Sequence, residues 1–383
     1  MRTNGRDEIP KASHPASSST MSINSLKPAE FPFKRLSSLP QLSYALENLA
    51  MSIATIITAC ADCILTLYLW IPLGLTRSVI QNVLTPLLRF LTSQPHSSAS
   101  NNTETQTQII LPRVIVISGA SSGIGASLVK TYAGPNNILV LLARNPARLN
   151  QVAKLARTAG CKAVETHSID YAQDGAENSI TIAIQTAHQK YGSIDLAISN
   201  AGTATFTDDD PNGPEPWGKN TAQRLTKINV TSSYAFIMTA WELMKKQRSG
   251  NICIVSSIVA LAGPPEFAAY AAAKANLMSF SQSLRALSTA YGIRVSCICP
   301  GFIETGMAGD LLAAGSSVPS FMLASSDQMA QRIKEAIEDE QPGAIWPLSH
   351  GLPLVALGRL NWLNADLSRW LMSKIGVAGQ MVT

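Results

Sequence analysis

The chain has 383 residues, of which 46% are hydrophobic and 14% are charged. This composition excludes an intrinsically disordered protein, and the length exceeds that of one average domain. The formal net charge of +5 is spread along the chain without a block of basic residues, so we expect no nucleic acid partner.

Neither the cysteines nor the histidines show the spacing of a metal site. Cys60 and Cys63 have no second cysteine pair or histidine nearby, and most of the six cysteines lie in apolar runs. We expect them to be small buried side chains rather than disulfides or ligands. The five scattered histidines are expected to have structural or surface roles. The sequence therefore predicts no metal centre.

The first ninety residues divide into two parts. Residues 1–38 are rich in Ser, Pro and Lys, which predicts a flexible tail, and residues 39–92 are predicted to form hydrophobic helices that associate with a membrane. The apolar run Leu49 to Ile71 is 23 residues long, enough to span a bilayer. Its nine Leu and Ile residues favour insertion by about 4 kcal/mol, against a cost of about 2.5–3.5 kcal/mol for Asp62.

A second apolar stretch, Leu73 to Leu91, follows Pro72 and contains two arginines. We therefore expect a tilted anchor followed by an interfacial helix. The alternative is a helix packed on the protein's own core. We expect association with the endoplasmic reticulum or another intracellular membrane. Positive charges on both sides of the run leave open on which side of that membrane the protein lies.

Residues 93–110 are polar and predict a linker between the hydrophobic segment and the next domain. The linker contains a glycosylation sequon at Asn101, which matters only if this segment faces an organelle lumen. A second sequon begins at Asn229, but its predicted helical position makes it inaccessible to glycosylation.

Residues 111–346 alternate short β-branched runs with stretches of helical length. The runs include VIVIS, ILVLLA, KAVETHS, LAIS, NICIVSS and RVSCIC. Such alternation predicts an α/β fold, and continuous apolar strands indicate a sheet that is covered on both faces. We expect a doubly wound, mostly parallel, Rossmann-like sheet of about seven strands.

A glycine-rich turn follows the first predicted strand and opens a helix. Gly119 allows the tight turn, Gly123 lets the backbone approach a pyrophosphate, and Gly125 lets the helix pack closely on the sheet. The helix N-terminus offers free N–H groups to the anion. The turn therefore predicts a dinucleotide site that is formed by Gly119, Ser121, Ser122, Gly123, Ile124 and Gly125.

The end of the second strand bears on the choice of cofactor. A carboxylate would bind the ribose 2′-hydroxyl of NAD there, but Ala143 and Arg144 stand in its place. Arg144 can bind a 2′-phosphate by charge-assisted hydrogen bonds. This favours NADP(H) over NAD(H), although Arg144 could instead be a solvated surface charge.

Three residues form a candidate catalytic group. Ser257 stands near the end of the fifth strand, thirteen residues before Tyr270, and Lys274 follows one helical turn after the tyrosine. A neighbouring ammonium favours the phenolate and is expected to lower the tyrosine pKa toward the working range of a general acid and base.

Together these motifs resemble the short-chain dehydrogenase/reductase family over about residues 112–307, in its branch with a single Rossmann-like domain. The resemblance rests on the order and spacing of SGASSGIG, Asn200-Ala201-Gly202, YAAAK and PGFIET. Two positions depart from the usual family pattern, namely Ser118 in place of Thr and Ala273 in place of Ser. Neither position carries chemistry, and the Ser118 hydroxyl can still brace the loop.

The resemblance implies a role for each matched residue. Tyr270 would exchange the proton, Ser257 would polarise the substrate oxygen, and Lys274 would bind the nicotinamide ribose. Asn229 would support a water that links Lys274 to solvent. The remaining cofactor contacts would be Asp170 at the adenine, Asn200 and Gly202 along the cofactor, and Ile303 and Thr305 at the carboxamide. The family also suggests a homodimer or homotetramer.

Residues 347–383 form an apolar C-terminal extension, which predicts helices that are either packed or interfacial. Together with the hydrophobic segment, this extension suggests an apolar substrate such as a lipid, steroid, retinoid or secondary metabolite. We predict an NADP(H)-dependent reductase of a ketone or aldehyde. The alternatives are an alcohol dehydrogenase that works oxidatively and a membrane scaffold that binds nucleotide without turnover.

Overall fold

The computed structural model describes residues 39–85, 114–204, 218–263, 267–308 and 323–374. The predicted tail 1–38 and the linker with its sequon at Asn101 lie outside these ranges. Most of the loop after Gly202 and residues 309–322 also lie outside them.

Seven parallel strands form one sheet in the order β3-β2-β1-β4-β5-β6-β7. The strands are β1 (Val114–Ser118), β2 (Ile138–Ala143), β3 (Ala163–Ser168), β4 (Leu196–Ser199), β5 (Gly250–Val255), β6 (Ile293–Pro300) and β7 (Gly343–Trp346). The order reverses between β1 and β4, which leaves a crevice at the carboxyl ends of these two strands. The predicted doubly wound α/β fold is confirmed.

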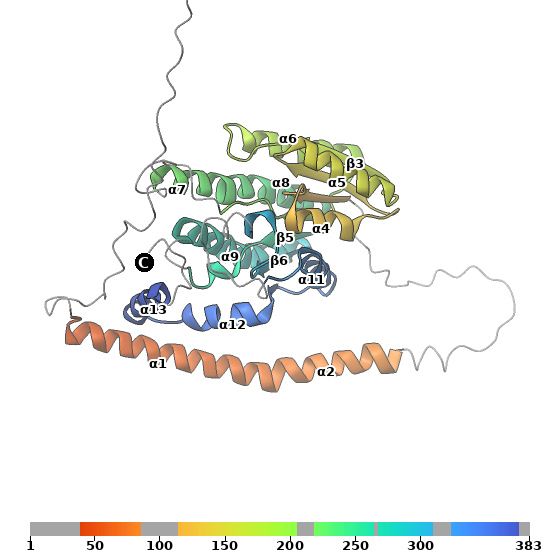
Figure 1. Cartoon of the computed structure of the whole chain (residues 1–383). Coiled ribbons are helices and arrows are strands. Elements are labelled where there is room, and N and C mark those ends of the chain that lie inside the picture. The colour runs from red at the N-terminus through yellow and green to blue at the C-terminus, as the bar shows by residue number, and fades with distance from the viewer. Residues whose placement is uncertain (1–38, 86–113, 205–217, 264–266, 309–322, 375–383) are drawn as a thin grey trace, which may run out of the picture.

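Helices cover both faces of the sheet (Figure 1). Those after the first strands are α4 (Gly123–Tyr132), α5 (Pro146–Thr158) and α6 (Ala176–Tyr191). The next are α7 (Lys219–Thr226), the π-helical turn η5 (Lys227–Thr231), α8 (Ser232–Gln247), the 3-10 turn η6 (Ile258–Ala260), α9 (Ala268–Ser288) and the 3-10 turn η8 (Thr289–Tyr291). The last are α11 (Ser326–Glu338), α12 (Leu348–Leu357) and α13 (Trp362–Lys374).

The continuous apolar strands are explained by two hydrophobic cores, one on each face of the sheet. Val114 and Val116 of β1 join α6, α8 and α9 in one core, which includes the fully buried Phe236. Ile115 and Ile117 point to the other face and join α4, α5 and α11. Successive strand residues therefore alternate between two buried faces rather than between core and solvent.

The hydrophobic N-terminal segment forms one long helix rather than the two separate segments expected from Pro72. It runs through α1 (Leu42–Leu65), η3 (Thr66–Trp70), α2 (Ile71–Val79) and η4 (Ile80–Leu84). Proline cannot donate to a carbonyl one turn back and would clash with it. The π-helical turn η3 stands directly before α2, whose first turn contains Pro72, and this wider turn accommodates the proline.

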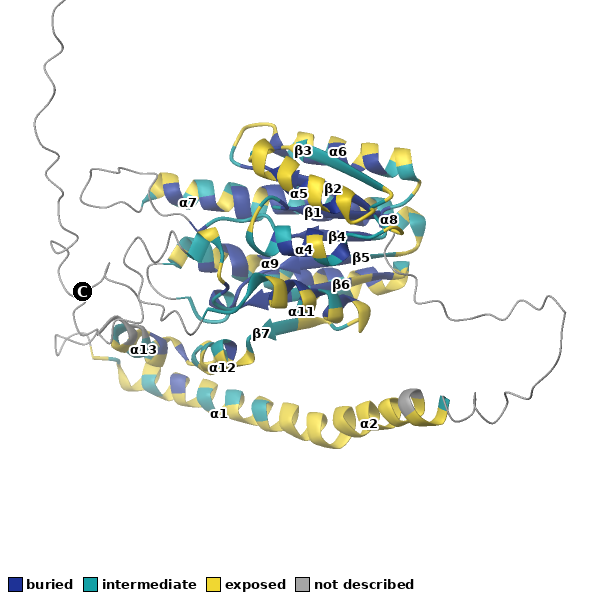
Figure 2. Cartoon of the chain, turned by 45° about the vertical axis from the view of Figure 1, so that its right-hand side comes forward, coloured by how far each residue is buried: buried dark blue, intermediate teal, exposed yellow. Residues whose placement is uncertain are grey.

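Within this segment, Leu42–Val79 is long and apolar enough to cross a membrane, judged by length and composition alone. The helix lies beneath α12 and α13 in two views that differ by 45° (Figures 1 and 2). The amide of Asn361, just before α13, donates hydrogen bonds to Asn48 O (2.7 Å) and Ser52 Oγ (2.6 Å) of α1. Both asparagines are buried, so this is a specific contact between distant parts of the chain.

The six cysteines are free, as expected from their spacing. Cys253 and Cys299 are buried in the sheet, and Cys161 and Cys297 are half-buried. The expectation of burial is wrong for Cys60 and Cys63, which are exposed, because the helix that carries them has little protein around it. No cluster of His, Cys, Asp or Glu in the described part of the chain could hold a metal ion.

Candidate active site

A cavity of about 720 Å³ opens at the carboxyl ends of the strands. It brings together all the site residues that were predicted from the sequence, with two exceptions that do not line it, Gly125 and Asn229. Gly125 is buried in the first turn of α4, and Asn229 is buried behind the cavity wall. The crevice of the sheet and the predicted site therefore coincide.

The glycine-rich loop is as tightly packed as its sequence predicted. Gly119 and Gly123 have φ angles of +67° and +49°, which favour glycine. A side chain at Gly125 would place its Cβ 2.0 Å from the carbonyl oxygen of Gly119. A Cβ at Gly123 would lie 2.8 Å from Cγ2 of Thr305. The loop thus approaches the strand β6 side of the cavity, and Ser122 precedes the free N-terminus of α4.

The hydroxyl of Ser118 braces this loop, as expected for the residue that replaces the usual threonine. Its Oγ accepts hydrogen bonds from the backbone N–H groups of Asn200 (2.9 Å) and Ala201 (3.0 Å). The Asn200 amide in turn donates to the carbonyls of Ser118 (3.2 Å) and Gly119 (3.4 Å). These bonds tie the ends of β1 and β4 together at the bottom of the crevice.

One end of the cavity is bordered by Arg144, Arg148 and Asp170. Asn145 caps α5 by accepting from the backbone N–H of Arg148 (3.0 Å), which places both arginines at the start of this helix. Asp170 Oδ1 accepts from the backbone N–H of Ala172 (3.0 Å), which fixes the carboxylate after β3. Arg148 was missed from the sequence, although it follows Arg144 by only four residues, in the first turn of α5.

The candidate catalytic residues lie together in the wall of the cavity. Lys274 is buried, its ammonium 5.8 Å from the centre of the Tyr270 ring, and it donates to the carbonyl of Val255 (3.0 Å). Ser257 hydrogen-bonds to the Tyr270 hydroxyl. The buried Ser256 donates to the Lys274 carbonyl (2.7 Å), which fixes the first turns of α9 against β5.

Burial controls the acidity of both groups. It raises the pKa of Tyr270 to about 12, while the hydrogen bond with Ser257 acts in the opposite direction. Burial also lowers the pKa of Lys274 to about 8, because the ammonium loses its hydration. The expected lowering of the tyrosine pKa is therefore wrong for this structure, since desolvation outweighs the opposing effect of Ser257.

Asn229 lies in the π-helical turn η5 and is fully buried. Its side chain accepts from Thr203 N (3.1 Å) and donates to the carbonyls of Thr203 (2.9 Å) and Leu225 (3.0 Å). A Cβ at Gly202 would lie 2.7 Å from Asn229 Oδ1 and 3.2 Å from Lys274 Nζ. Gly202 thus separates these two side chains, and its missing side chain leaves the gap between them open.

The opposite wall contains Ile303 and Thr305, which follow β6. Ile303 pairs with Ala324 in an isolated bridge, and Thr305 Oγ1 donates to the carbonyl of Ile303 (3.3 Å). His350 of α12 supports this segment from outside, because its Nδ1 accepts from the backbone N–H of Phe302 (3.3 Å). No sequence pattern predicts this role, since His350 belongs to no motif.

Helix α12 also contributes Ser349, Pro353, Leu354 and Leu357 to the cavity. Other apolar side chains that line the cavity are Ile258, Val259, Phe267, Met307 and Leu323. The lining is therefore largely apolar, and it comes partly from the C-terminal extension.

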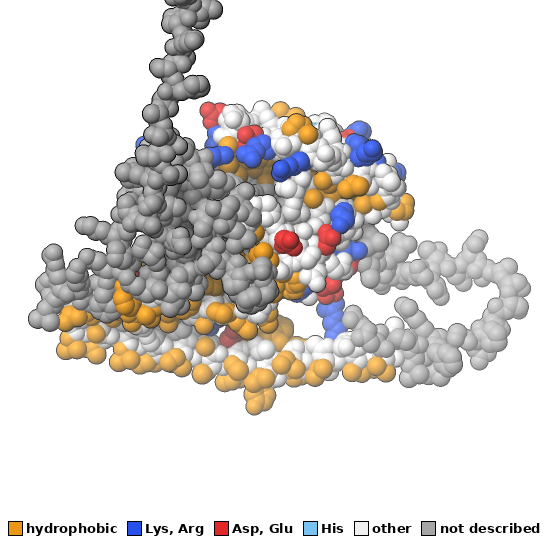
Figure 3. Space-filling model, in the orientation of Figure 1, with side chains coloured by type: hydrophobic (Ala, Val, Ile, Leu, Met, Phe, Trp, Pro, Cys, Tyr) orange, Lys and Arg blue, Asp and Glu red, His pale blue; other side chains and the backbone are white. Residues whose placement is uncertain are grey.

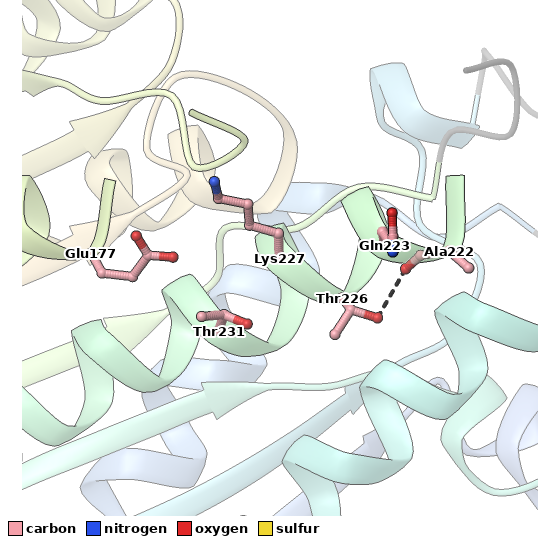
Figure 4. A pocket seen from close by; sticks show the side chains of 6 residues that line it. All are labelled: Glu177, Ala222, Gln223, Thr226, Lys227 and Thr231. Carbon is pink, nitrogen blue, oxygen red and sulfur yellow. Dashed lines mark hydrogen bonds between the residues drawn. The ribbon is translucent and has the colours of Figure 1, made fainter. Parts of the chain in front are cut away.

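A second hollow of about 440 Å³ lies apart from these residues (Figure 4). It is lined by Glu177, Ala222, Gln223, Thr226, Lys227 and Thr231. Within it, Thr226 donates to the carbonyl of Ala222 (2.9 Å). It contains none of the predicted site residues, so it is not the candidate active site.

The residues of the large cavity fit a dinucleotide. The glycine-rich loop has no side chain in the way of a pyrophosphate, the N-terminus of α4 faces it, and polar groups stand at both ends. Ile303 and Tyr270 line the same cavity and could hold the nicotinamide end of such a cofactor.

The comparisons with known proteins agree with this geometry. The family model described as short chain dehydrogenase matches residues 113–315. A Drosophila melanogaster protein, "Dehydrogenase/reductase SDR family protein 7-like", is 28% identical over 271 residues, covering 69% of this chain and 81% of its own length. The 3-oxoacyl-acyl-carrier-protein reductase of Chlamydia muridarum is 30% identical over 200 residues, covering 52% of this chain and 77% of its own.

Solved structures give the same fold. A short-chain dehydrogenase from Sphingobium yanoikuyae in complex with NADPH superposes with a TM-score of 0.55 at 24% identity, over 64% of this chain and 92% of that one. The actinorhodin polyketide ketoreductase with NADPH gives a TM-score of 0.54 at 20% identity, over 63% of this chain and 97% of that one. The sheet, the cavity and the family match agree, and the chain belongs to the short-chain dehydrogenase/reductase family of oxidoreductases.

Proposed function

We propose that the protein is an NADP(H)-dependent reductase that converts a ketone or aldehyde of an apolar substrate into an alcohol. The observation that carries this proposal is a single cavity with Tyr270, Ser257 and Lys274 in its wall and two arginines at its far end. The relatives named as ketoreductases support the same direction of reaction.

When bound, the nicotinamide cofactor supplies the hydride. Ser257 and Tyr270 hold the substrate oxygen through their hydroxyl groups, and the Tyr270 hydroxyl donates the proton to this oxygen as the hydride arrives at the carbon. Lys274 then returns a proton to the tyrosinate, and Asn229 supports the path from Lys274 to solvent.

The acidity of Tyr270 supports the reductive direction. With its pKa raised to about 12, the side chain is protonated at neutral pH, which is the form that reduction requires. Oxidation requires the phenolate instead, so an alcohol dehydrogenase working oxidatively is the second candidate and needs an additional lowering of this pKa.

Arg144 and Arg148 support NADP(H) over NAD(H). Both stand at the cavity edge with no carboxylate at the end of β2, and two guanidinium groups can bind a 2′-phosphate by charge-assisted hydrogen bonds. Asp170 borders the same end of the cavity, where it would contact the adenine, and Asn200 would line the cofactor.

The apolar cavity wall and the long apolar N-terminal helix support an apolar substrate and association with an intracellular membrane, such as that of the endoplasmic reticulum. Substrates of this class include lipids, steroids, retinoids and secondary metabolites. We also propose a homo-oligomer, which sedimentation of the full-length protein in detergent tests directly.

The cofactor proposal is tested by titrating the full-length protein in detergent with NADPH and NADH, followed by nicotinamide fluorescence. We expect Arg144→Ala to weaken NADPH binding by about 1.5–3 kcal/mol, the contribution of a hydrogen bond to a charged group, and to leave NADH binding unchanged. Lys154→Ala is the control, because Lys154 is an exposed cation of the same helix that does not line the cavity. Equal affinity for both cofactors in the wild type would refute the NADP(H) preference.

The scaffold alternative is tested with Tyr270→Phe. This substitution removes the proton donor but keeps the ring, so we expect NADPH binding to persist while reduction of ketones is lost. If a screen of apolar ketones finds wild-type turnover and the variant retains it, Tyr270 is not the proton donor. If the wild type binds NADPH but reduces none of them, the scaffold is favoured.

A further inference from the structure

The N-terminal helix turns its large apolar side chains away from the protein. The side chains of α1 that the rest of the chain covers are small or polar, and they recur every three or four residues: Ala45, Asn48, Ser52, Thr55 and Ala59. The large apolar residues between them are 49–62% exposed, namely Leu46, Leu49, Ile53, Ile56 and Ile57. This is the reverse of the pattern for a surface helix in water.

A helix that packs in a lipid environment typically has small and polar residues at its contact with the protein and large apolar residues on its outer side. The covered stripe is held by the buried Asn361, which donates to Asn48 O and Ser52 Oγ. Asp62, the acidic residue of the long apolar run, falls three residues after Ala59 and so continues the same stripe. Its side chain is exposed.

Beyond the contact, large exposed apolar side chains lie on all sides of the helix from Ile64 to Leu75, between the exposed charges of Asp62 and Arg77. Every side chain described from Cys60 to Leu84 is exposed, including Tyr68 at 79% and Trp70 at 63%. A second protein copy would cover one side of such a helix, whereas a lipid phase surrounds it. Figure 3 shows the hydrophobic side chains gathered along this helix, while charged and polar groups are spread over the sheet domain above it.

The helix as a whole is longer than the hydrocarbon core is thick, and its first half is docked on the domain. Leu42–Val79 contains 38 residues, or about 57 Å at 1.5 Å per residue, against about 30 Å for the hydrocarbon core. Its first half runs along the base of the domain beneath α12 and α13 (Figures 1 and 2). A helix perpendicular to the membrane would draw this charged domain into the bilayer.

Helix α12 connects this face with the cavity. His350, Leu354 and Leu357 line the cavity, while Leu348 and Leu352 of the same helix are 56% and 57% exposed. The wall that separates the cavity from the apolar face is thus one helix thick.

We propose that the helix 42–84, docked through Asn361, lies in the plane of a membrane and forms with α12 and α13 a face that binds the bilayer surface, so that an apolar substrate reaches the cavity from the lipid beside α12. The entry of an apolar substrate into the cavity rests on the proposed function, whereas the binding of this face to the bilayer does not.

The docking face is tested by flotation of the purified full-length protein with phosphatidylcholine vesicles. We expect Ile53→Asp and Ile57→Asp, on the outward side of α1, to lower the floated fraction at least tenfold. Leu155→Asp and Ile182→Asp are matched controls, since these side chains are 59% and 53% exposed on α5 and α6, and they should float like the wild type. Equal flotation of all four variants would overturn the proposal.

The in-plane orientation is tested by disulfide trapping in vesicles, in a background with Cys60→Ser and Cys63→Ser. We expect Ser52→Cys to cross-link with Asn361→Cys under mild oxidation. Asn364→Cys is the control and should not cross-link with Ser52→Cys, because Asn364 lies three residues further along the chain and is exposed. Protease digestion of sealed microsomes should reach an N-terminal tag and the catalytic domain from the same side. A tag protected from the protease while the domain is digested would show a spanning helix and refute the in-plane orientation.

NADPH titration of the same variants separates the two proposals. A variant that no longer floats but binds NADPH as tightly as the wild type has lost only the docking face. A wild-type protein that floats but does not bind NADPH would refute only the proposed function. Cross-linking between copies through α1 would indicate a second copy as the occupant and overturn the lipid assignment.

Discussion

At the scale of single residues, Lys274 combines a catalytic position with a strongly altered acidity. Its ammonium is buried between Val255 and the Tyr270 ring, which lowers its pKa to about 8. A base with a lowered pKa carries its proton below this value and loses it as the pH rises through it. The lysine can therefore supply a proton at neutral pH but not in alkaline solution.

We expect kcat for ketone reduction to be constant below pH 7 and to fall tenfold per unit above about pH 8, the pKa of Lys274, because Lys274 restores the tyrosine proton in each turnover. Tyr270 remains protonated over this range, because its pKa is raised to about 12. The measurement is a pH–rate profile from pH 6 to 10, a range that includes the pKa of Lys274. A profile that stays flat to pH 10 would exclude Lys274 as the proton source.

Gly125 offers a test of the nucleotide loop. Its Cβ would lie 2.0 Å from the Gly119 carbonyl oxygen, a backbone atom that cannot yield without moving the loop. We expect Gly125→Ala to abolish measurable NADPH binding by fluorescence titration. Gly134→Ala is the control, because a Cβ there meets nothing within 4 Å, and binding that survives in Gly125→Ala would show that the loop adapts.

At the scale of elements, the C-terminal helix α12 completes the site of the sheet domain. His350 accepts from the backbone of Phe302 and packs on its ring at 5.6 Å, next to the segment with Ile303 and Thr305. Burial lowers the pKa of His350, which keeps its ring neutral and its Nδ1 free to accept. The extension thus positions the segment expected to hold the nicotinamide.

We expect His350→Ala to raise the KM for NADPH by about two- to tenfold, in line with the loss of one hydrogen bond of about 0.5–1.5 kcal/mol. The kcat should change less, since no reacting group is removed. His188→Ala on α6 is the control, because His188 does not line the cavity. Steady-state kinetics with a saturating ketone provide the measurement, and an unchanged KM would remove His350 from the site.

At the scale of the whole molecule, the two cores on either face of the sheet hold the crevice in place. Phe236 of α8 is the largest side chain among those with almost no exposure, and it packs in the core with α6 and α9. Because α8 follows the turn that carries Asn229, and α9 carries Tyr270 and Lys274, this core also fixes the catalytic side of the cavity.

We expect Phe236→Ala to lower the free energy of unfolding by about 3–5 kcal/mol, the sum of lost burial and a new cavity. The control is Ile182→Ala on α6, whose side chain is 53% exposed and should cost much less. Urea unfolding in detergent, followed by circular dichroism, compares the two. A loss below 1 kcal/mol for Phe236→Ala would mean that the core rearranges around the vacancy.

The sequence alone determined the parts of this protein in which local chemistry dictates structure. Continuous apolar strands required a sheet covered on both faces, and the glycines at 119, 123 and 125 required a tight strand-to-helix turn. The spacing of Tyr270 and Lys274 required one helix face. These features depend on residues close together in the chain, so periodicity and turn geometry suffice to predict them.

Only the tertiary structure decided what depends on distant contacts. The acidity of Tyr270 and Lys274 follows from burial by neighbours from several elements, which reversed the expected direction for the tyrosine. The role of His350 arises because the extension folds back over β6. The contact of Asn361 with Asn48 joins residues 313 positions apart, and no local pattern specifies such a pairing. Desolvation and packing are properties of the assembled chain, and for that reason they had to be seen in three dimensions.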